Sequence, residues 1–138
     1  MRFWDSSALV PLVSDEPSTD ALTALAATDR GILVSFITPV EVTSAIWRKA
    51  RTIGNEEARS RSHSRLAALQ AQWVVVNAFQ DVVEHALRLV ARHGLRGADA
   101  IQLASARLIR ASNAPMPFVT LDEELIYAAR AEGFPVLP

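Results

Sequence analysis

Short apolar runs alternate with longer segments of helical periodicity along this 138-residue chain. The apolar runs lie at residues 2–4, 32–37, 73–76, 117–120 and 135–137. Short runs of this kind, without regular polar alternation, are typical of strands buried on both faces. Strands separated by helices connect through right-handed crossovers, which favour a parallel sheet. The sequence therefore predicts an α/β fold, namely a three-layer α/β/α sandwich around a mainly parallel sheet of about four or five strands.

The segments between the apolar runs carry helix signals. Thr38 and Thr120 each precede a glutamate by three residues, a spacing typical of an N-terminal capping box, and Pro39 suits the first helical turn. Gly94 is placed to end a helix. Helices are expected at residues 20–27, 38–52, 56–72, 81–92, 98–111 and 120–131. Because no repeat or long linker interrupts this order, residues 1–138 are expected to form one domain.

Composition narrows the classes of function. The 14 basic and 15 acidic residues give a net charge of −1, so any binding to nucleic acid needs a local basic patch. The chain has no cysteine, which excludes disulfide scaffolds, thiolate zinc sites and cysteine nucleophiles. Asp5 comes too early for a signal-peptide core, and no apolar run approaches a membrane span. We expect a soluble cytoplasmic protein.

Four carboxylates follow the predicted strands or lie near the start of predicted helices: Asp5, Glu41, Asp99 and Asp122. Parallel sheets bind ligands beyond the carboxyl ends of their strands, so we expect these four at one rim. For each residue taken alone, helix capping is the better explanation, since acids stabilise a helix N-terminus. Taken together, they repel one another unless protons or a cation compensate.

A hard divalent cation can offset the repulsion among these four carboxylates. It takes oxygen ligands, and Mg²⁺ typically binds one or two carboxylates and keeps several waters. Such an ion polarises a phosphoryl oxygen and lowers the pKa of a water molecule. The four carboxylates therefore indicate metal-assisted hydrolysis.

Four motifs make the chain resemble the PIN-domain ribonucleases. They are DSSALV at residues 5–10, PVEV at 39–42, LRGADAIQLA at 95–104, and FVTLD at 118–122 followed by Ala128 and Ala129. Their order matches the family, and they are spread over nearly the whole chain. In its length and in the residues of these motifs, the chain looks most like the VapC-type toxins of bacterial type II toxin–antitoxin pairs.

This resemblance implies a Mg²⁺- or Mn²⁺-dependent endoribonuclease that hydrolyses RNA phosphodiester bonds and is restrained by a cognate antitoxin protein. It assigns catalysis and metal binding to Asp5, Glu41, Asp99 and Asp122, with Asp5 and Asp99 as the best candidates for direct metal ligands. Homodimers are common among such proteins, although nothing in this sequence pattern indicates one.

The residues around the four acids follow the family pattern with one departure. Ser7 and Thr120 match small polar positions that support the pocket in these relatives. Pro11 stands where relatives often carry a lysine, which removes one phosphate contact. Glu123 and Glu124 lie beside Asp122, and either could assist or replace it, although both are expected to face solvent in the first helical turn.

Several other residues allow two explanations. Arg96, three residues before Asp99, suits either a scissile phosphate or an ion pair with a neighbouring carboxylate. The basic stretch at residues 48–65 suits either RNA guidance or, as the better expectation, a solvated helix surface. Trp47 is expected in helix packing, with a groove for a partner helix as the minor alternative.

Two other functions compete with RNA hydrolysis. The main alternative is a catalytically inactive PIN-like module that binds nucleic acid or protein, and the presence of all four acids counts against it. A phosphatase of the haloacid-dehalogenase type also combines an α/β fold with an acidic Mg²⁺ site. That chemistry needs a second aspartate two residues after the first, where this chain has Ser7.

Overall fold

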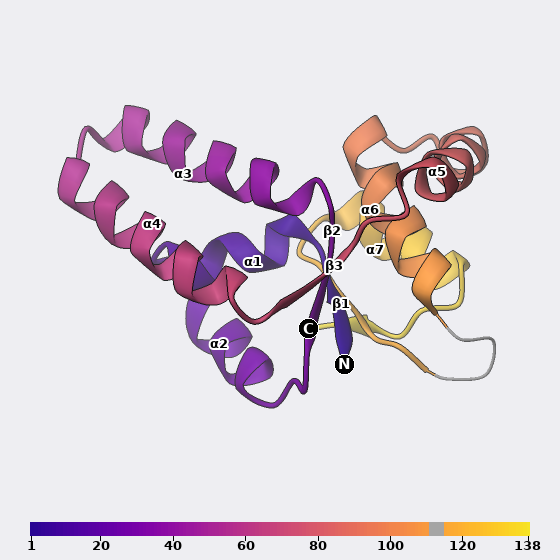
Figure 1. The fold of residues 1–138 in the computed structure, drawn as a ribbon, viewed down its shortest axis with the longest axis horizontal. Coiled ribbons are helices and arrows are strands. Elements are labelled where there is room, and N and C mark those ends of the chain that lie inside the picture. Colours follow the sequence, from indigo (N-terminus) through magenta and orange to yellow (C-terminus); the bar gives the residue numbers. More distant parts are fainter. Residues whose placement is uncertain (111–114) are drawn as a thin grey trace.

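The computed structural model describes residues 1–110 and 115–138. Within them, five strands form one sheet in the order β3-β2-β1-β4-β5, with every neighbouring pair parallel (Figure 1). The strands are β1 (Arg2–Trp4), β2 (Ile32–Ser35), β3 (Trp73–Val76), β4 (Phe118–Val119) and β5 (Val136–Leu137). The predicted parallel sheet is confirmed.

Helices cover both faces of this sheet. They are α1 (Ser6–Val13), α2 (Thr19–Ala27), α3 (Thr38–Ile53), α4 (Glu56–Gln70), α5 (Phe79–His93), α6 (Gly97–Ile109) and α7 (Glu123–Ala131). Figure 1 shows α1 to α4 on one side of the sheet and α5 to α7 on the other. The three-layer α/β/α sandwich predicted from the sequence is therefore confirmed. In the part of the chain that the structure describes, no helix has the length and apolar character needed to cross a bilayer.

Two cores, one on each face of the sheet, explain why the strands lack polar alternation. Phe3 and Phe118 stack with their ring centroids 5.3 Å apart and belong to the core that includes α5, α6 and α7. The next residues along these strands, Trp4 and Val119, belong to the core formed with α1 to α4. Each central strand is thus buried on both faces, as in other parallel sheets.

The helix α1 has no counterpart among the predicted elements. Its residues Ala8, Leu9, Pro11 and Val13 are all buried, so its sequence shows no polar face. Pro11 also argues against a helix interior, because proline lacks the backbone donor. The predicted end of the 98–111 helix falls in part on residues outside the described ranges, and α6 is described as far as Ile109.

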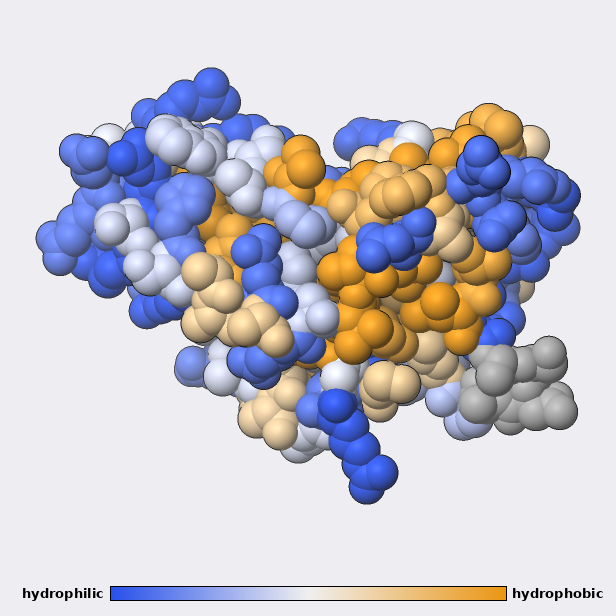
Figure 2. Space-filling view, viewed as in Figure 1, coloured by the Kyte–Doolittle hydropathy of each residue, from blue (hydrophilic) through white to orange (hydrophobic). Residues whose placement is uncertain are grey.

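The surface is divided between a polar end and an apolar side. Figure 2 shows hydrophilic residues over the hairpin of α3 and α4, and apolar residues gathered toward α5 and α6. Phe79, Val83 and Leu87 on α5 are 55%, 47% and 67% exposed. The sheet itself adds exposed Val74 from the edge strand β3.

A buried acid joins the C-terminal ends of α5, α6 and α7. Glu132 follows α7, and its side chain is only 6% exposed. Its Oε1 lies 3.0 Å from Arg92 Nη1 and 2.7 Å from His93 Nε2, and its Oε2 lies 2.8 Å from Arg107 Nη1. Burial by itself would raise the pKa of Glu132, but the hydrogen bonds from His93 and Arg92 and the charge of Arg107 lower it below its ordinary value.

We expect Glu132→Gln to lower the free energy of unfolding by about 1–3 kcal/mol, because Arg92 and Arg107 lose a buried counter-charge. Since the folded-state pKa of Glu132 is depressed, its contribution is complete above the ordinary carboxyl pKa and is lost as pH falls through the depressed value. Urea denaturation at neutral and at acidic pH measures both effects, and the difference from wild type should shrink on acidification.

The matched control for this measurement is Glu84→Gln. Glu84 forms an ion pair with Arg88 one helical turn away, and both side chains are 64% exposed. Its removal should change stability by less than about 0.5 kcal/mol. If the two variants lose equal stability, the buried ion pairs of Glu132 contribute no more to the free energy of unfolding than an exposed pair does.

Candidate active site

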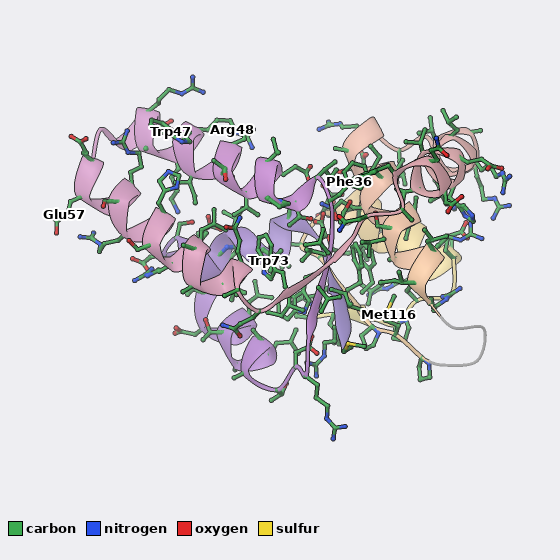
Figure 3. All side chains as sticks on the ribbon, viewed as in Figure 1. Phe36, Trp47, Arg48, Glu57, Trp73 and Met116 are labelled. Carbon is green, nitrogen blue, oxygen red and sulfur yellow. The ribbon has the colours of Figure 1, made fainter. Side chains whose placement is uncertain are left out.

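The carboxyl edge of the sheet brings the four predicted acids within electrostatic range of one another. Asp5 follows β1 directly, Glu41 and Asp99 lie in the first turns of α3 and α6, and Asp122 precedes α7. The charges of Asp122, Asp5 and Glu41 all raise the pKa of Asp99. We call this group of four the acidic rim. Phe36, which follows β2 at the same edge, is labelled in Figure 3.

Asp5 is the buried member of the acidic rim, at 4% exposed. Its Oδ2 accepts hydrogen bonds from the Ser7 backbone N–H (3.0 Å), the Ser7 hydroxyl (2.6 Å) and the Thr120 hydroxyl (3.1 Å). The Leu121 N–H donates to Ser7 Oγ at 2.9 Å, which joins α1 to the loop after β4. Burial raises the pKa of Asp5 above its ordinary value despite these donors, and the charge of Glu41 adds to the effect.

Glu41 is held by a cluster of polar side chains from three helices. Its Oε2 accepts from the Ser6 hydroxyl at 2.6 Å and from Gln102 Nε2 at 2.5 Å. Gln102 is 1% exposed and also lies 2.9 Å from Ser6 Oγ and 3.1 Å from Thr38 Oγ1. This amide therefore connects α1, α3 and α6 beneath the acidic rim.

The capping box predicted at Thr38 does not form. The helix begins after Ile37, whose side chain makes no capping bond, and the Thr38 hydroxyl lies in the cluster around Gln102. Glu41 is likewise bound to that cluster. The tertiary contacts of both residues have replaced the local capping contacts that their spacing predicts.

Gln102 and Ser6 are two residues of the site that the sequence prediction missed. Gln102 lies three residues after Asp99, so both project from neighbouring positions on α6. A lone amide among Ala100, Leu103 and Ala104, all of them buried, was the available signal. Ser6 directly follows Asp5, but only the packing of α1 against α3 reveals its partner.

Asp99 is half-buried, as are Glu41 and Asp122. The N-cap of α6 is Arg96, so the capping explanation for Asp99 is wrong. Burial, followed by the charges of Asp122, Asp5 and Glu41, raises the pKa of Asp99 to about 6, and the charge of Arg96 partly opposes this. Arg96 is exposed and, among the described residues, forms no ion pair.

Asp122 caps α7 while remaining within range of Asp99. Its Oδ1 accepts from the Leu125 N–H at 2.9 Å, so the capping explanation is right for this residue. The capping box predicted at Thr120 does not form, because α7 begins at Glu123 and the Thr120 hydroxyl reaches Asp5. Glu123 and its neighbour Glu124 are exposed, as predicted.

The carboxylate oxygens of the acidic rim fit a hard cation. Within residues 1–110 and 115–138, every hydrogen bond to the side chains of Asp5, Glu41 and Asp122 reaches one oxygen of each carboxylate. The second oxygen of each, and both oxygens of Asp99, accept no hydrogen bond from those residues. Unpaired carboxylate oxygens are the ligands that Mg²⁺ and Mn²⁺ prefer.

The acidic rim is not by itself a complete ligand cage. No three His, Asp or Glu side chains of the described residues are arranged as a ready-made metal site. Asp5, Glu41, Asp99 and Asp122 therefore stay predictions as metal ligands and catalytic residues.

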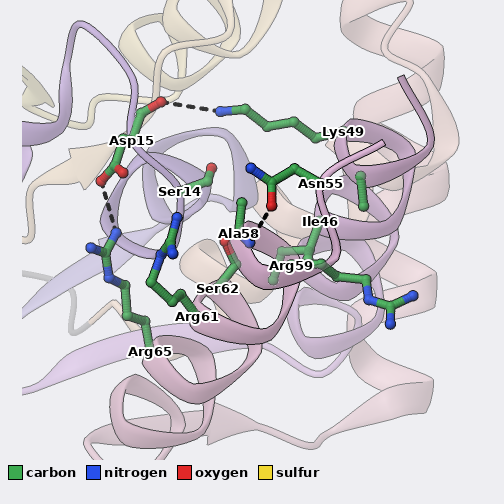
Figure 4. A pocket seen from close by; sticks show the side chains of 11 residues that line it. Ser14, Asp15, Ile46, Lys49, Asn55, Ala58, Arg59, Arg61, Ser62 and Arg65 are labelled. Carbon is green, nitrogen blue, oxygen red and sulfur yellow. Dashed lines mark hydrogen bonds and ion pairs between the residues drawn. The ribbon is translucent and has the colours of Figure 1, made fainter. Parts of the chain in front are cut away.

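A separate hollow of about 200 Å³ lies between α3, α4 and the end of α1 (Figure 4). Lys49, Arg61 and Arg65 line it, together with Asp15, which lies 2.8 Å from Arg65 Nη1. None of the four acids lines this hollow. The acidic rim is thus a distinct feature, at the edge of the sheet.

Solved structures share this fold. A toxin–antitoxin complex from Klebsiella pneumoniae matches with a TM-score of 0.66 and 24% identity, covering 100% of this chain and 97% of that chain. PAE2754 from Pyrobaculum aerophilum matches with a TM-score of 0.71 and 21% identity, over 94% and 84% of the two chains. FitAcB from Neisseria gonorrhoeae matches with a TM-score of 0.69 and 16% identity, over 100% and 97%.

These identities establish a common fold and nothing more specific. A comparison with curated proteins found no significant match. The family model described as PIN domain, however, matches residues 2–131. This match includes all four acids and nearly every element of the sheet. The chain belongs to the PIN domain family.

Proposed function

We propose that this protein is a Mg²⁺- or Mn²⁺-dependent endoribonuclease. The observation that carries the proposal is the acidic rim, in which four carboxylates keep oxygens without a hydrogen-bond donor and form no ion pair among the described residues. The resemblance of its four motifs to PIN-domain ribonucleases supports RNA as the substrate. We also propose that it acts in the cytoplasm, the location expected from the sequence.

In this proposal the acids would hold the cation, and neighbouring hydroxyl groups orient the acids. A bound divalent cation would supply Lewis-acid activation of the phosphodiester and a more acidic water. Asp5 and Asp99 would hold it, with Glu41 and Asp122 beside them. Ser7 and Thr120 fix the orientation of the Asp5 carboxylate. In the net reaction, water would add at phosphorus as a P–O bond of the RNA breaks, and the proton that water loses would end on the leaving oxygen, so no nucleophilic side chain is required.

Gln102 and Arg96 have supporting roles in this proposal. Gln102 positions Glu41 through a hydrogen bond and is too buried to touch RNA. Arg96 is exposed beside Asp99, where its charge lowers the pKa of that carboxyl. The guanidinium in this position can contact the scissile phosphate, which would otherwise enter a region dominated by negative charge.

We also propose that the protein is the toxin of a toxin–antitoxin pair, restrained by an antitoxin protein. The likeness to the Klebsiella pneumoniae toxin–antitoxin complex over the full length of this chain supports this role. An unrestrained endoribonuclease would damage cellular RNA, so a cell that makes one needs an antitoxin that inhibits it. RNA cleavage by the purified protein is the property on which this proposal depends.

We expect the purified protein to cleave single-stranded RNA with Mg²⁺ or Mn²⁺, and Asp5→Asn and Asp99→Asn to slow cleavage by more than about a hundredfold. Losing a partner of a metal ligand already costs about 10–100-fold, and losing a ligand should cost more. Glu123→Gln is the control, because this exposed acid adjoins Asp122 and should change the rate by no more than about twofold. Wild-type rates for Asp99→Asn would contradict the assigned site.

Metal binding can be tested without any cleavage. Because the pKa of Asp99 is raised to about 6, its ionised form destabilises the fold, and this penalty grows as pH rises from the ordinary pKa of 3.8 to above 6. Without divalent cations, Asp99→Asn should therefore raise the melting temperature at pH ~7, and the gain should vanish at pH ~4.

Added Mg²⁺ should raise the melting temperature of the wild type, since a ligand of the folded state stabilises it. The same addition should raise that of Asp99→Asn much less. Scanning calorimetry across Mg²⁺ concentrations measures both effects. An equal upward shift in the two proteins would place the cation elsewhere.

We further propose that two copies associate through the apolar side of α5. Phe79, Val83, Leu87 and Val90 form an exposed stripe along this helix. Large exposed apolar patches mark interaction sites. Acids flank the stripe in the first half of α5 and arginines in the second half, so two antiparallel copies would place opposite charges together in a two-fold interface.

We expect the wild type to have the mass of a dimer in light scattering coupled to size exclusion, and the double variant Val83→Glu/Leu87→Glu to have that of a monomer. Burying two carboxylates in this interface would be prohibitive. Tyr127→Glu is the control, since Tyr127 is 73% exposed but lies on α7. A wild type that stays monomeric at high concentration would refute the interface.

A further inference from the structure

We propose that the exposed face of α3 binds single-stranded RNA and leads it to the acidic rim, an inference that rests on the proposed function. The α3 face consists of Ser44, Trp47, Arg48 and Arg51, all exposed. On it, Trp47 stacks against an unpaired base, and Arg48 and Arg51 contact phosphates.

The direction of α3 places this face beside the acids. The helix begins at the carboxyl edge of the sheet and runs away from it (Figure 1). Ser44, Arg48 and Arg51 follow Glu41 at intervals of three or four residues and so share one side of the helix. At 1.5 Å per residue, Arg48 lies about 10 Å and Arg51 about 15 Å along the axis from Glu41. RNA bound here would have its neighbouring phosphates at the acidic rim.

The two arginines of the α3 face keep their charges available for a ligand. Within the described ranges, neither Arg48 nor Arg51 forms an ion pair. The remaining cations of the α3–α4 hairpin are all paired: Lys49 with Glu16, Arg59 with Glu56, Arg61 with Glu57 and Arg65 with Asp15. In a chain with a net charge of −1, these unpaired arginines are a local attraction for phosphate that the chain as a whole lacks.

Trp47 supplies the surface that distinguishes a single strand from a duplex. The residue is 45% exposed, and Figure 3 shows it beside Arg48 along α3. The Arg59 guanidinium lies over one face of the ring, 4.4 Å from its centroid, and the His63 ring lies 5.9 Å from it. The helix α4 therefore holds the indole in place, and only its other face is available to a base. An aromatic ring fixed in this way can stack on any unpaired base, whereas the bases of a duplex already stack on one another.

Packing against α4 explains the covered part of the Trp47 side chain but not its exposed part. A packing role requires an apolar side chain of suitable size, whereas stacking on a base requires an aromatic ring. Trp47→Leu and Trp47→Phe therefore separate the two roles. Phenylalanine keeps a ring, and leucine keeps only apolar volume.

The experiment measures RNA affinity by fluorescence anisotropy in the Asp99→Asn background, with a uridine-rich single strand and a duplex as probes. Trp47→Leu should weaken single-strand binding by about five- to a hundredfold, and Trp47→Phe should retain most of it. Arg48→Ala/Arg51→Ala should weaken binding and make the slope of log affinity against log salt shallower by about 1.4, the value for two lost phosphate contacts.

Arg30→Ala is the matched control. Arg30 is exposed and precedes β2, at the edge of the sheet opposite the acidic rim. Its removal lowers the net charge by one, half the change made by Arg48→Ala/Arg51→Ala, and it should leave the affinity unchanged. Melting temperatures of all variants test whether they remain folded.

Four outcomes would overturn the inference. These are wild-type affinity for Trp47→Leu, equal binding of duplex and single strand, equal losses for Trp47→Phe and Trp47→Leu, and an effect confined to binding of a protein partner. Cleavage with an intact Asp99 separates the two proposals. If the α3 variants bind and cleave like the wild type, the endoribonuclease stands and the α3 face is wrong. If the wild type cleaves no RNA, the proposed function is wrong, while the binding data still decide the role of the α3 face.

Discussion

Burial of carboxylates, together with their mutual repulsion, is the constraint around which the acidic rim is arranged. The parallel order of the strands and the starting points of α1, α3, α6 and α7 bring the acidic rim to one edge of the sheet. Donors from Ser7, Thr120 and Gln102 offset part of the cost for Asp5 and Glu41. For Asp99 the described residues provide no hydrogen-bond donor, and its pKa rises to about 6. The fold thus retains a destabilising charge at the place where a bound cation would relieve it, as functional sites often do.

Helix capping and participation in the site are compatible rather than competing roles. Asp5 and Asp122 each use one carboxylate oxygen to cap a helix, through the N–H groups of Ser7 and Leu125. The second oxygen of each remains directed by that bond but accepts no donor among the described residues. Because the cap fixes the carboxylate relative to the helix start, and each helix start follows a strand directly or within a short loop, the position of the acid is set by the sheet. A cap is therefore a means of holding a ligand oxygen in place.

The sequence was informative where the structure depends on local pattern and uninformative where it depends on distant contacts. Apolar runs predicted all five strands, even β3, whose Val74 and Val75 are exposed at the edge of the sheet. The helix α1 was missed because a buried helix has no polar face, and Pro11 disguised it further. The role of Gln102 was hidden because its partners come from α1 and α3, far away in sequence. The hydroxyls of Thr38 and Thr120 point to the same limit, since tertiary bonds replaced the local caps that the sequence predicts.

The same imbalance of charge would couple metal and RNA under the proposed function. A cation at the acidic rim reduces the repulsion that an incoming phosphate meets, and each ligand then raises the affinity for the other by the same factor. The unpaired arginines make this coupling specific. Arg48, Arg51 and Arg96 flank the acidic rim without ion-pair partners among the described residues, whereas Arg92 and Arg107 are paired with buried Glu132 at the far ends of α5 and α6. A uniformly basic surface would hold RNA wherever it landed. In a chain of net charge −1, Arg48, Arg51 and Arg96 add attraction for phosphate beside the acids, where the cation can act on RNA.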